Sequence, residues 1–306
     1  MSNSKREDCR LIIQKDYPDF LKKKNVVGLA FGNKLTNSID TNEPCLIIFV
    51  IKKQSPSELN ATDFIPKTYK GIITDVIETG ELRHSSLTEK ILPMQFGYSI
   101  GPSSFNGVGS SGCLVTDRCG NYYILSNNHV LSIFDALPIG TPILYPGVLD
   151  GGRYPDDLIG ILCKKIPLLT SSFGEDFINY VDCALVKIIS PSMISKNIAL
   201  VGPVKGVRDS ELNMNVKKVG RSTELTTGKI VQLDALLKVT NLQGEDIIYH
   251  NQITTTLMTD SGDSGSLLLD EDNNAVGLCF GNSDTISMVN PIKSVLTALN
   301  VSILTS

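Results

Sequence analysis

The chain has 306 residues, of which 42% are hydrophobic, and a formal net charge of −4. This is an ordinary globular composition with room for two domains, and the slight negative charge argues against a nucleic-acid partner. No apolar run reaches the length of a membrane span. The seven cysteines are scattered singly and there are only three histidines, so we expect no metal site and no other cofactor.

The segment at residues 1–8 is charged, and no apolar signal-peptide core follows it. An odd number of scattered cysteines, in a chain without an export signal, is typical of reduced thiols. We therefore expect a cytoplasmic protein that does not associate with membranes.

Residues 5–24 carry apolar or aromatic side chains at roughly helical spacing, namely Cys9, Ile13, Tyr17 and Phe20. Because proline lacks the N–H that an inner helical turn needs, we expect Pro18 to divide this segment into two short helical pieces. The pieces would pack on the rest of the protein or on a sister chain.

Residues 25–92 have the pattern of a small α+β unit. Ser55 followed by Pro56 predicts a helix start, and three apolar runs predict strands at residues 26–32, 45–51 and 72–78. No cluster of catalytic residue types is present. We therefore expect residues 1–92 to form a structural or partner-binding extension.

From residue 93 the strands become short, and turns that contain glycine recur at close intervals. This pattern is typical of an all-β barrel or sandwich. We expect a mainly β body of two packed barrels, at residues 93–200 and 201–306. Asn290 as cap and Pro291 as first residue predict a C-terminal helix with an apolar stripe.

The sequence Gly262-Asp263-Ser264-Gly265-Ser266 presents a serine between two glycines, ahead of the apolar run 267–269. Glycine permits a tight turn, which can expose the hydroxyl to a substrate. A serine is a weak nucleophile unless a base lies beside it and a third group orients that base. The alternative is an ordinary turn between two strands.

Of the three histidines, His129 is the best placed to act as a base. It follows the apolar run 122–125 in a polar turn, a position at a barrel rim where loops carry function. His84 lies in a polar linker, where we expect a solvent-exposed side chain, and His250 lies at a strand end, where we expect a surface or cross-strand histidine.

The orienting carboxylate should be shielded, because a desolvated Asp fixes the imidazole tautomer. Asp182 precedes the apolar run 183–186, and a carboxylate there is costly unless it is paired. The chain therefore offers His129, Asp182 and Ser264, in that order, as a candidate triad.

The segments around these three residues resemble the catalytic motifs of chymotrypsin-like (trypsin-like) serine proteases: Ser126-Asn127-Asn128-His129-Val130, Val181-Asp182-Cys183-Ala184-Leu185 and Gly262-Asp263-Ser264-Gly265-Ser266. The layout is most similar to cytoplasmic trypsin-like peptidases of bacteria and to plant relatives of the narrow-leaf type. The resemblance implies two Greek-key β-barrels with the triad between them. It also implies an acyl-enzyme on Ser264 and an oxyanion hole from the N–H groups of Gly262 and Ser264.

The chain departs from the digestive members of that family, because their disulfides and the Ile-Val-Gly-Gly of a cleaved zymogen are missing. A buried Asp263 would still need a cation. Arg221, in Val219-Gly220-Arg221-Ser222, resembles the arginine that bacterial relatives use for this purpose. We therefore expect an Arg221–Asp263 ion pair and a protein made in active form; otherwise Arg221 is a surface cation of a strand.

The resemblance also places Met258, six residues before Ser264, at the base of the primary specificity pocket, with Cys279 and Gly281 on a second wall. No acid occurs at these positions, which disfavours Arg or Lys as the recognised side chain. We expect a medium apolar side chain instead, although Met258 could equally be a core residue.

Three functions fit these features. The first is a serine endopeptidase that acts on proteins or peptides, gated by a regulatory partner or by homo-oligomeric assembly. The second is a protease-fold binding or scaffold module with little turnover, and the third is a non-peptide esterase. The presence of all three triad residues favours the first.

Overall fold

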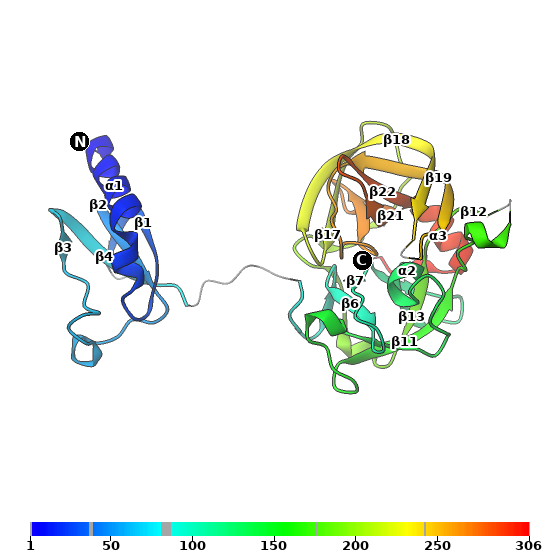
Figure 1. Ribbon diagram of the computed structural model, residues 1–306, viewed down its shortest axis with the longest axis horizontal. Helices are drawn as coiled ribbons and strands as arrows, with labels where there is room; N and C mark the ends of the chain where they lie inside the picture. Colours follow the sequence, from blue (N-terminus) through cyan, green and yellow to red (C-terminus); the bar gives the residue numbers. More distant parts are fainter. Residues whose placement is uncertain (1, 37–38, 81–86, 175–176, 242, 306) are drawn as a thin grey trace. The chain divides into compact units, whose positions relative to one another are not determined.

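The chain forms two compact units, unit 1 at residues 1–85 and unit 2 at residues 86–306. The sequence pattern, by comparison, suggests a boundary after residue 92. His84 lies outside the described residues. The computed structural model describes residues 2–36, 39–80, 87–174, 177–241 and 243–305 (Figure 1).

Unit 1 consists of one long helix and a four-stranded sheet. Its elements are α1 (Ser2–Leu21), β1 (Val26–Thr36), β2 (Ile39–Val50), a 3-10 turn (Pro56–Glu58), β3 (Thr68–Tyr69) and β4 (Ile72–Glu78). The strand order is β1-β2-β4-β3, with β1 and β2 antiparallel and β2 and β4 parallel. The three strands and the helical start at Pro56 that the sequence predicts are confirmed.

Helix α1 covers the sheet through an apolar face. Cys9, Ile12 and Phe20 are buried, and they share one apolar cluster with Leu46 and Ile48 of β2. Burial of this face, rather than helix propensity alone, stabilises a helix of this composition.

The expected break at Pro18 is wrong, because α1 continues through Pro18 to Leu21. Pro18 lies in the last turn, so its missing N–H removes a hydrogen bond only near the helix end. The Lys22 N–H still donates to the Pro18 carbonyl oxygen, at 3.2 Å.

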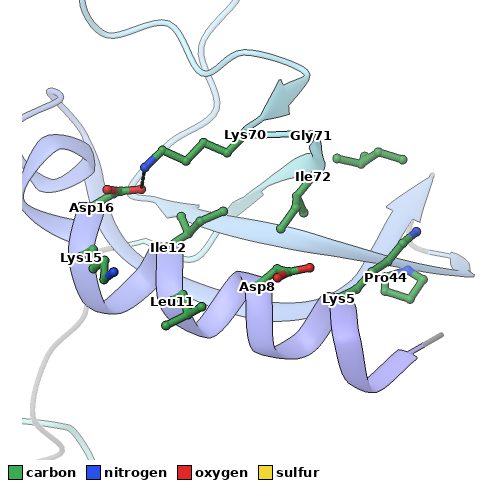
Figure 2. A pocket seen from close by; sticks show the side chains of 11 residues that line it. Lys5, Asp8, Leu11, Ile12, Lys15, Asp16, Pro44, Lys70, Gly71 and Ile72 are labelled. Carbon is green, nitrogen blue, oxygen red and sulfur yellow. Dashed lines mark hydrogen bonds and ion pairs between the residues drawn. The ribbon is translucent and has the colours of Figure 1, made fainter.

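A surface cavity of about 600 Å³ lies between α1 and the sheet of unit 1 (Figure 2). Ile12 and Ile72 line it, and Lys70 and Asp16 form an ion pair beside it with 2.7 Å between Nζ and Oδ2. Its described lining carries charges of both signs but no serine, cysteine or histidine. We assign it no chemistry.

Unit 2 contains two large curled sheets and a small one (Figure 1). In spatial order, the first sheet consists of β23 (Ser302–Ile303), β8 (Leu114–Thr116), β9 (Tyr122–Ser126), β13 (Ala184–Ile188), β11 (Leu158–Lys165), β10 (Pro142–Leu144), β6 (Ser99–Pro102) and β7 (Gly109–Ser110). The small sheet consists of β15 (Gly202–Pro203), β14 (Ile194–Ile198) and β5 (Met94–Phe96).

The second large sheet contains the longest strands. In spatial order it consists of β12 (Ile178–Asn179), β19 (Asp246–Thr256), β18 (Glu224–Thr240), β17 (Asn215–Gly220), β20 (Leu267–Asp270), β21 (Asn274–Asn282) and β16 (Gly206–Val207), and β22 (Ile286–Pro291) pairs with β19 and β21. The helices of unit 2 are α2 (Asn128–Leu131) and α3 (Ile292–Leu299), with 3-10 turns at Val148–Asp150, Ser171–Phe173 and Pro191–Met193.

The two large sheets pack over a shared apolar core. Leu125 and Val186 of the first sheet are buried in the same cluster as Leu267 and Leu278 of the second, and Val295 of α3 joins them. The expected mainly β fold with helices near both ends is confirmed. None of the described helices is long and apolar enough to cross a membrane.

We expect Phe20→Ala to destabilise unit 1. The Phe20 ring is 2% exposed and meets Tyr69 edge-on, with 4.9 Å between ring centroids. Its loss should cost about 3–5 kcal/mol, measured as faster hydrogen exchange of β1 and β2 in the full chain. Leu21→Ala, at a side chain that is 47% exposed, is the control, and equal exchange in the two variants would contradict the packing described.

Candidate active site

The Ser264 loop connects β19 to β20 and depends on two glycines in the left-handed region. Gly262 has φ 96° and Gly265 has φ 92°, values that other residues rarely adopt. A Cβ at Gly265 would clash with the Ser126 hydroxyl and the Ser110 carbonyl oxygen. The glycines that mark this turn in the sequence are therefore required by its geometry.

His129 and Asp182 meet where two neighbouring strands of the first sheet end. Ser126 at the end of β9 pairs with Ala184 at the start of β13, which brings the following His129 beside the preceding Asp182. The distance from His129 Nδ1 to Asp182 Oδ2 is 2.5 Å, and the His129 N–H donates to Oδ1 at 3.1 Å. The Asp182 side chain is 1% exposed and that of His129 18%, so a buried carboxylate orients a ring that solvent can reach.

Two asparagines hold the backbone of Asp182. Asn127 Nδ2 donates to the Asp182 carbonyl oxygen at 2.7 Å, and Asn290 Oδ1 accepts from the Asp182 N–H at 3.0 Å. The expectation that Asn290 caps the C-terminal helix is therefore wrong. Its side chain lies against Asp182 and Leu278, and α3 begins after Pro291.

Strand β7 lies between the Ser264 loop and the short helix α2, which carries His129. The Ser110 N–H donates to the Ser264 carbonyl oxygen at 2.7 Å. A Cβ at Gly109 would meet both the Val130 side chain and this same carbonyl oxygen. Only a backbone without a side chain fits between them, so the Ser264 loop and helix α2 lie close to each other.

The Ser264 hydroxyl is not directed at the imidazole. Ser264 Oγ donates to the Phe280 carbonyl oxygen at 3.3 Å. Within the described part of the chain, no hydrogen bond joins Ser264 Oγ to the His129 ring. The hydroxyl must turn towards His129 before a proton can pass between them.

The turn before Ser264 presents two free donors. The Asp263 N–H closes it by donating to the Asp260 carbonyl oxygen at 2.9 Å, with Gly262 at the third position, as in a type II turn. Among the described residues, the N–H groups of Gly262 and Ser264 donate to no acceptor. This pair of free N–H groups beside a serine is suited to binding a developing oxyanion.

The buried Asp263 is paired with Lys218, so the expected Arg221–Asp263 ion pair is wrong. Lys218 Nζ lies 3.2 Å from Asp263 Oδ2, and both side chains are 0% exposed. Burial lowers the pKa of Lys218, and the nearby Asp263 opposes this. The N–H groups of Ser222 and Thr223 donate to Asp263 Oδ1 at 2.8 and 3.1 Å, and the Asp260 N–H and Thr223 Oγ1 donate to Oδ2 at 3.0 and 2.5 Å.

Arg221 instead pairs with Asp150. Its Nε donates to Asp150 Oδ2 at 2.8 Å and its Nη2 to Oδ1, in a two-pronged contact. The hydrogen bond to Asp150 raises the pKa of Arg221 despite partial burial. The prediction failed because strand β17 ends at Gly220, which leaves Arg221 in the turn, away from the strand face that carries Lys218.

The residues after His129 form an unusual left-handed segment. Ile133, Phe134 and Asp135 have φ values of 52°, 52° and 67°, which is costly for side chains with a Cβ. Lys165 holds the segment through an ion pair with Asp135, 3.0 Å between Nζ and Oδ1. The result is that the Phe134 ring stacks on the His129 ring, with 5.4 Å between centroids.

The expected specificity residues have different surroundings. Met258 is 4% exposed and belongs to an apolar core cluster, but it also borders an open cavity of about 490 Å³. This cavity is lined by Thr223, Thr226, Leu257, Met258, Thr259, Asp260, Asn282, Ser283 and Asp284. Gly281 lies next to it on β21, and its carbonyl oxygen accepts from Thr259 Oγ1 at 3.5 Å.

Cys279 does not line a substrate wall. Its side chain is fully buried in the core, and burial raises the pKa of its thiol to about 11. Its N–H donates to the Ser266 carbonyl oxygen and its carbonyl oxygen accepts from the Gly265 N–H. Both backbone groups of Cys279 therefore bond the segment that follows Ser264, so Cys279 supports the Ser264 loop from behind.

His250 is a half-buried residue of β19 whose ring meets Tyr180 edge-on, with 6.2 Å between centroids. Sequence reasoning missed Lys218, Asn290 and Asp150. One signal existed for Lys218, since two-residue periodicity places it on the same strand face as the buried Val216. Asn290 and Asp150 act through contacts between distant segments, for which no local pattern exists.

Comparisons place this geometry in a known fold. No protein-family model and no curated protein matches the sequence. Thermobifida fusca protease A matches the structure with a TM-score of 0.50 at 18% identity, over 69% of this chain and 98% of its own. Unit 2 has the fold of chymotrypsin-like serine proteases.

Two further solved structures agree. The Nocardiopsis protease NAPase gives a TM-score of 0.51 at 17% identity, over 69% of this chain and 98% of its own. A glutamic acid-specific serine protease, described as using a histidine triad in substrate binding, gives a TM-score of 0.51 at 18% identity, over 69% of this chain and 100% of its own. At these identities the likeness is one of fold.

We expect Lys218→Ala to be strongly destabilising, because it leaves Asp263 buried without its cation. The loss should be about 3–5 kcal/mol, measured by urea unfolding followed through hydrogen exchange of β17 and β20. Lys217→Ala is the matched control on the same strand, where Nζ donates to the Glu271 carbonyl oxygen at the surface. Equal unfolding midpoints for the two variants would argue against the ion pair.

Proposed function

We propose that the chain is a serine endopeptidase that hydrolyses peptide bonds through an acyl-enzyme on Ser264. The observation that carries the proposal is the 2.5 Å contact of His129 Nδ1 with the buried Asp182, next to a serine loop with two free N–H groups. The fold of the catalytic unit supports it. The buried carboxylate leaves His129 Nε2 as the ring nitrogen available for proton transfer.

The reaction follows from these positions. Ser264 Oγ turns from Phe280 and attacks the peptide carbonyl carbon while His129 Nε2 takes its proton. The carbonyl oxygen becomes an oxyanion, which the N–H groups of Gly262 and Ser264 stabilise. The imidazolium then gives the proton to the amine, the C–N bond breaks, and water releases the acyl group by the same steps with His129 again as base.

The Lys218–Asp263 pair supports the further proposal that the enzyme is active without cleavage of a precursor. A buried Asp263 needs a neighbouring cation, and the side chain of Lys218 provides it within unit 2. A new chain terminus is then not required for the turn at Gly262 to form.

We propose an apolar side chain of medium size as the recognised group, since Met258 borders the cavity beside the Ser264 loop. We propose a cytoplasmic location, which the seven unpaired cysteines support. We also propose that unit 1 serves assembly or a regulatory partner, because a protease among cellular proteins needs restraint. The proposed partners are protein or peptide substrates rather than nucleic acids or membranes.

One observation favours the second candidate, a binding or scaffold module with little turnover. The Ser264 hydroxyl donates to the Phe280 carbonyl oxygen rather than to His129. If that hydrogen bond persisted with a substrate bound, the serine would not be activated. An esterase that acts on non-peptide acyl groups would use the same residues, and its substrates distinguish it.

We expect a fluorophosphonate probe to label the wild-type chain at Ser264, because this reagent requires an activated serine. Ser264→Ala should show no labelling, and peptide mapping by mass spectrometry identifies the site. Ser266→Ala, in the same loop, is the control and should retain labelling. Failure of the folded wild-type chain to react would favour the binding module.

We expect Asp182→Asn to lower kcat by about 10⁴-fold while the fold is kept, because an amide favours the wrong imidazole tautomer. Peptide hydrolysis gives kcat, and circular dichroism tests the fold. Asp156→Asn, at an exposed loop carboxylate, should leave kcat unchanged. A loss smaller than tenfold would show that Asp182 does not orient the base.

A further inference from the structure

We propose that Ser222 is a positioning residue that holds the Ser261–Gly262 peptide in the orientation catalysis requires, and that Arg221 and Asp150 keep Ser222 in place. This inference rests on the proposed function. It concerns the side chains that set the direction of the Gly262 N–H in the oxyanion hole. The residues involved do not touch the reacting atoms. They act through one peptide group.

A hydrogen bond from Ser222 sets the orientation of that peptide. Ser222 Oγ donates to the Ser261 carbonyl oxygen at 2.5 Å. In a planar trans peptide the C=O and the next N–H point in opposite directions. With the Ser261 oxygen held by Ser222, the Gly262 N–H is directed to the opposite side, where among the described residues it meets no acceptor.

A hydrogen bond from Arg221 sets the direction of the Ser222 hydroxyl. Arg221 Nη1 donates to Ser222 Oγ at 3.0 Å. A hydroxyl has one proton to donate and lone pairs to accept. Because a lone pair of Ser222 Oγ accepts from Arg221, the proton is available for the Ser261 oxygen.

Asp150 in turn holds Arg221 in place. The Arg221 guanidinium forms the two-pronged contact with Asp150. The Asp150 side chain is 6% exposed, and its Oδ2 also accepts from Ser99 Oγ at 2.6 Å. Asp150 follows β10 of the first sheet, whereas Ser222 follows β17 of the second. A loop of one sheet therefore holds the oxyanion turn of the other.

The turn needs such support because glycine permits an alternative. At the third position of a turn, Gly262 can also take a negative φ, as in a type I turn. That change rotates the Ser261–Gly262 peptide and turns its carbonyl oxygen to the side where the N–H now lies. The side chain of Ser222 is the contact that distinguishes the two orientations.

The test compares Ser222→Ala with Ser222→Thr in the full chain. Because one of two oxyanion donors becomes misdirected for part of the time, Ser222→Ala should lower kcat by about 10- to 100-fold with KM within about threefold. Ser222→Thr keeps the hydroxyl and should restore kcat to within about threefold. Asp150→Asn should lower kcat too, and its effect should not add to that of Ser222→Ala.

A second measurement does not depend on activity. A crystal structure of Ser222→Ala should show the Ser261–Gly262 peptide rotated, with a negative φ at Gly262, whereas Ser222→Thr should keep the positive value. Unchanged kcat in Ser222→Ala, or an unrotated peptide in its crystals, would overturn the inference and leave the endopeptidase intact. A wild-type chain without fluorophosphonate labelling would instead sink the proposed function, while the crystal comparison still decides the role of Ser222.

Discussion

The ion pair between Lys218 and Asp263 is the contact on which the geometry of the site depends. Two opposite charges with no exposure to solvent are tolerated only when each satisfies the other and the remaining hydrogen bonds are made. Asp263 meets this condition through its contacts with the turn at Ser222 and Thr223. Because Asp263 lies between Gly262 and Ser264, its anchored side chain fixes the position of this turn, while the orientation of the Ser261–Gly262 peptide depends in addition on Ser222.

Around that ion pair, the candidate site is assembled from both sheets of unit 2. The first sheet contributes His129 and Asp182 at adjoining strand ends, and the second contributes Ser264. Buried polar side chains join the halves: Ser110 Oγ donates to the Gly262 carbonyl oxygen at 2.9 Å, and Asn290 Oδ1 accepts from the Asp182 N–H. Such groups are costly to bury without partners, so the partners they find specify how the two sheets meet.

Sequence reasoning predicted the His129–Asp182 contact and the tight turn at Ser264, both of which the structure contains, because each depends on residues that are adjacent in the chain. The glycines around Ser264, the polar turn at His129 and the acid ahead of an apolar strand at Asp182 each have a local pattern with a physical cause. It failed where the partner was a matter of strand register. Lys218 and Arg221 are close in sequence, and the choice between them as the cation for Asp263 depends on which one lies on the buried strand face. The prediction for Cys279 failed because both faces of β21 are buried from Ala275 to Phe280, so its side chain lies in the core.

The polypeptide enters unit 2 at the loop that carries Asp150. Lys90 Nζ contacts Asp157 Oδ1 at 2.5 Å, and the N–H and carbonyl oxygen of Ile91 both bond the Tyr145 hydroxyl. Lys90 and Ile91 thus bind the two ends of the segment that carries Asp150, at Asp157 and at Tyr145. Removal of the chain before residue 87 would leave these contacts intact, whereas removal of the chain through residue 92 would abolish them. The support of the Asp150 segment therefore depends on the position at which unit 1 is cut from the chain.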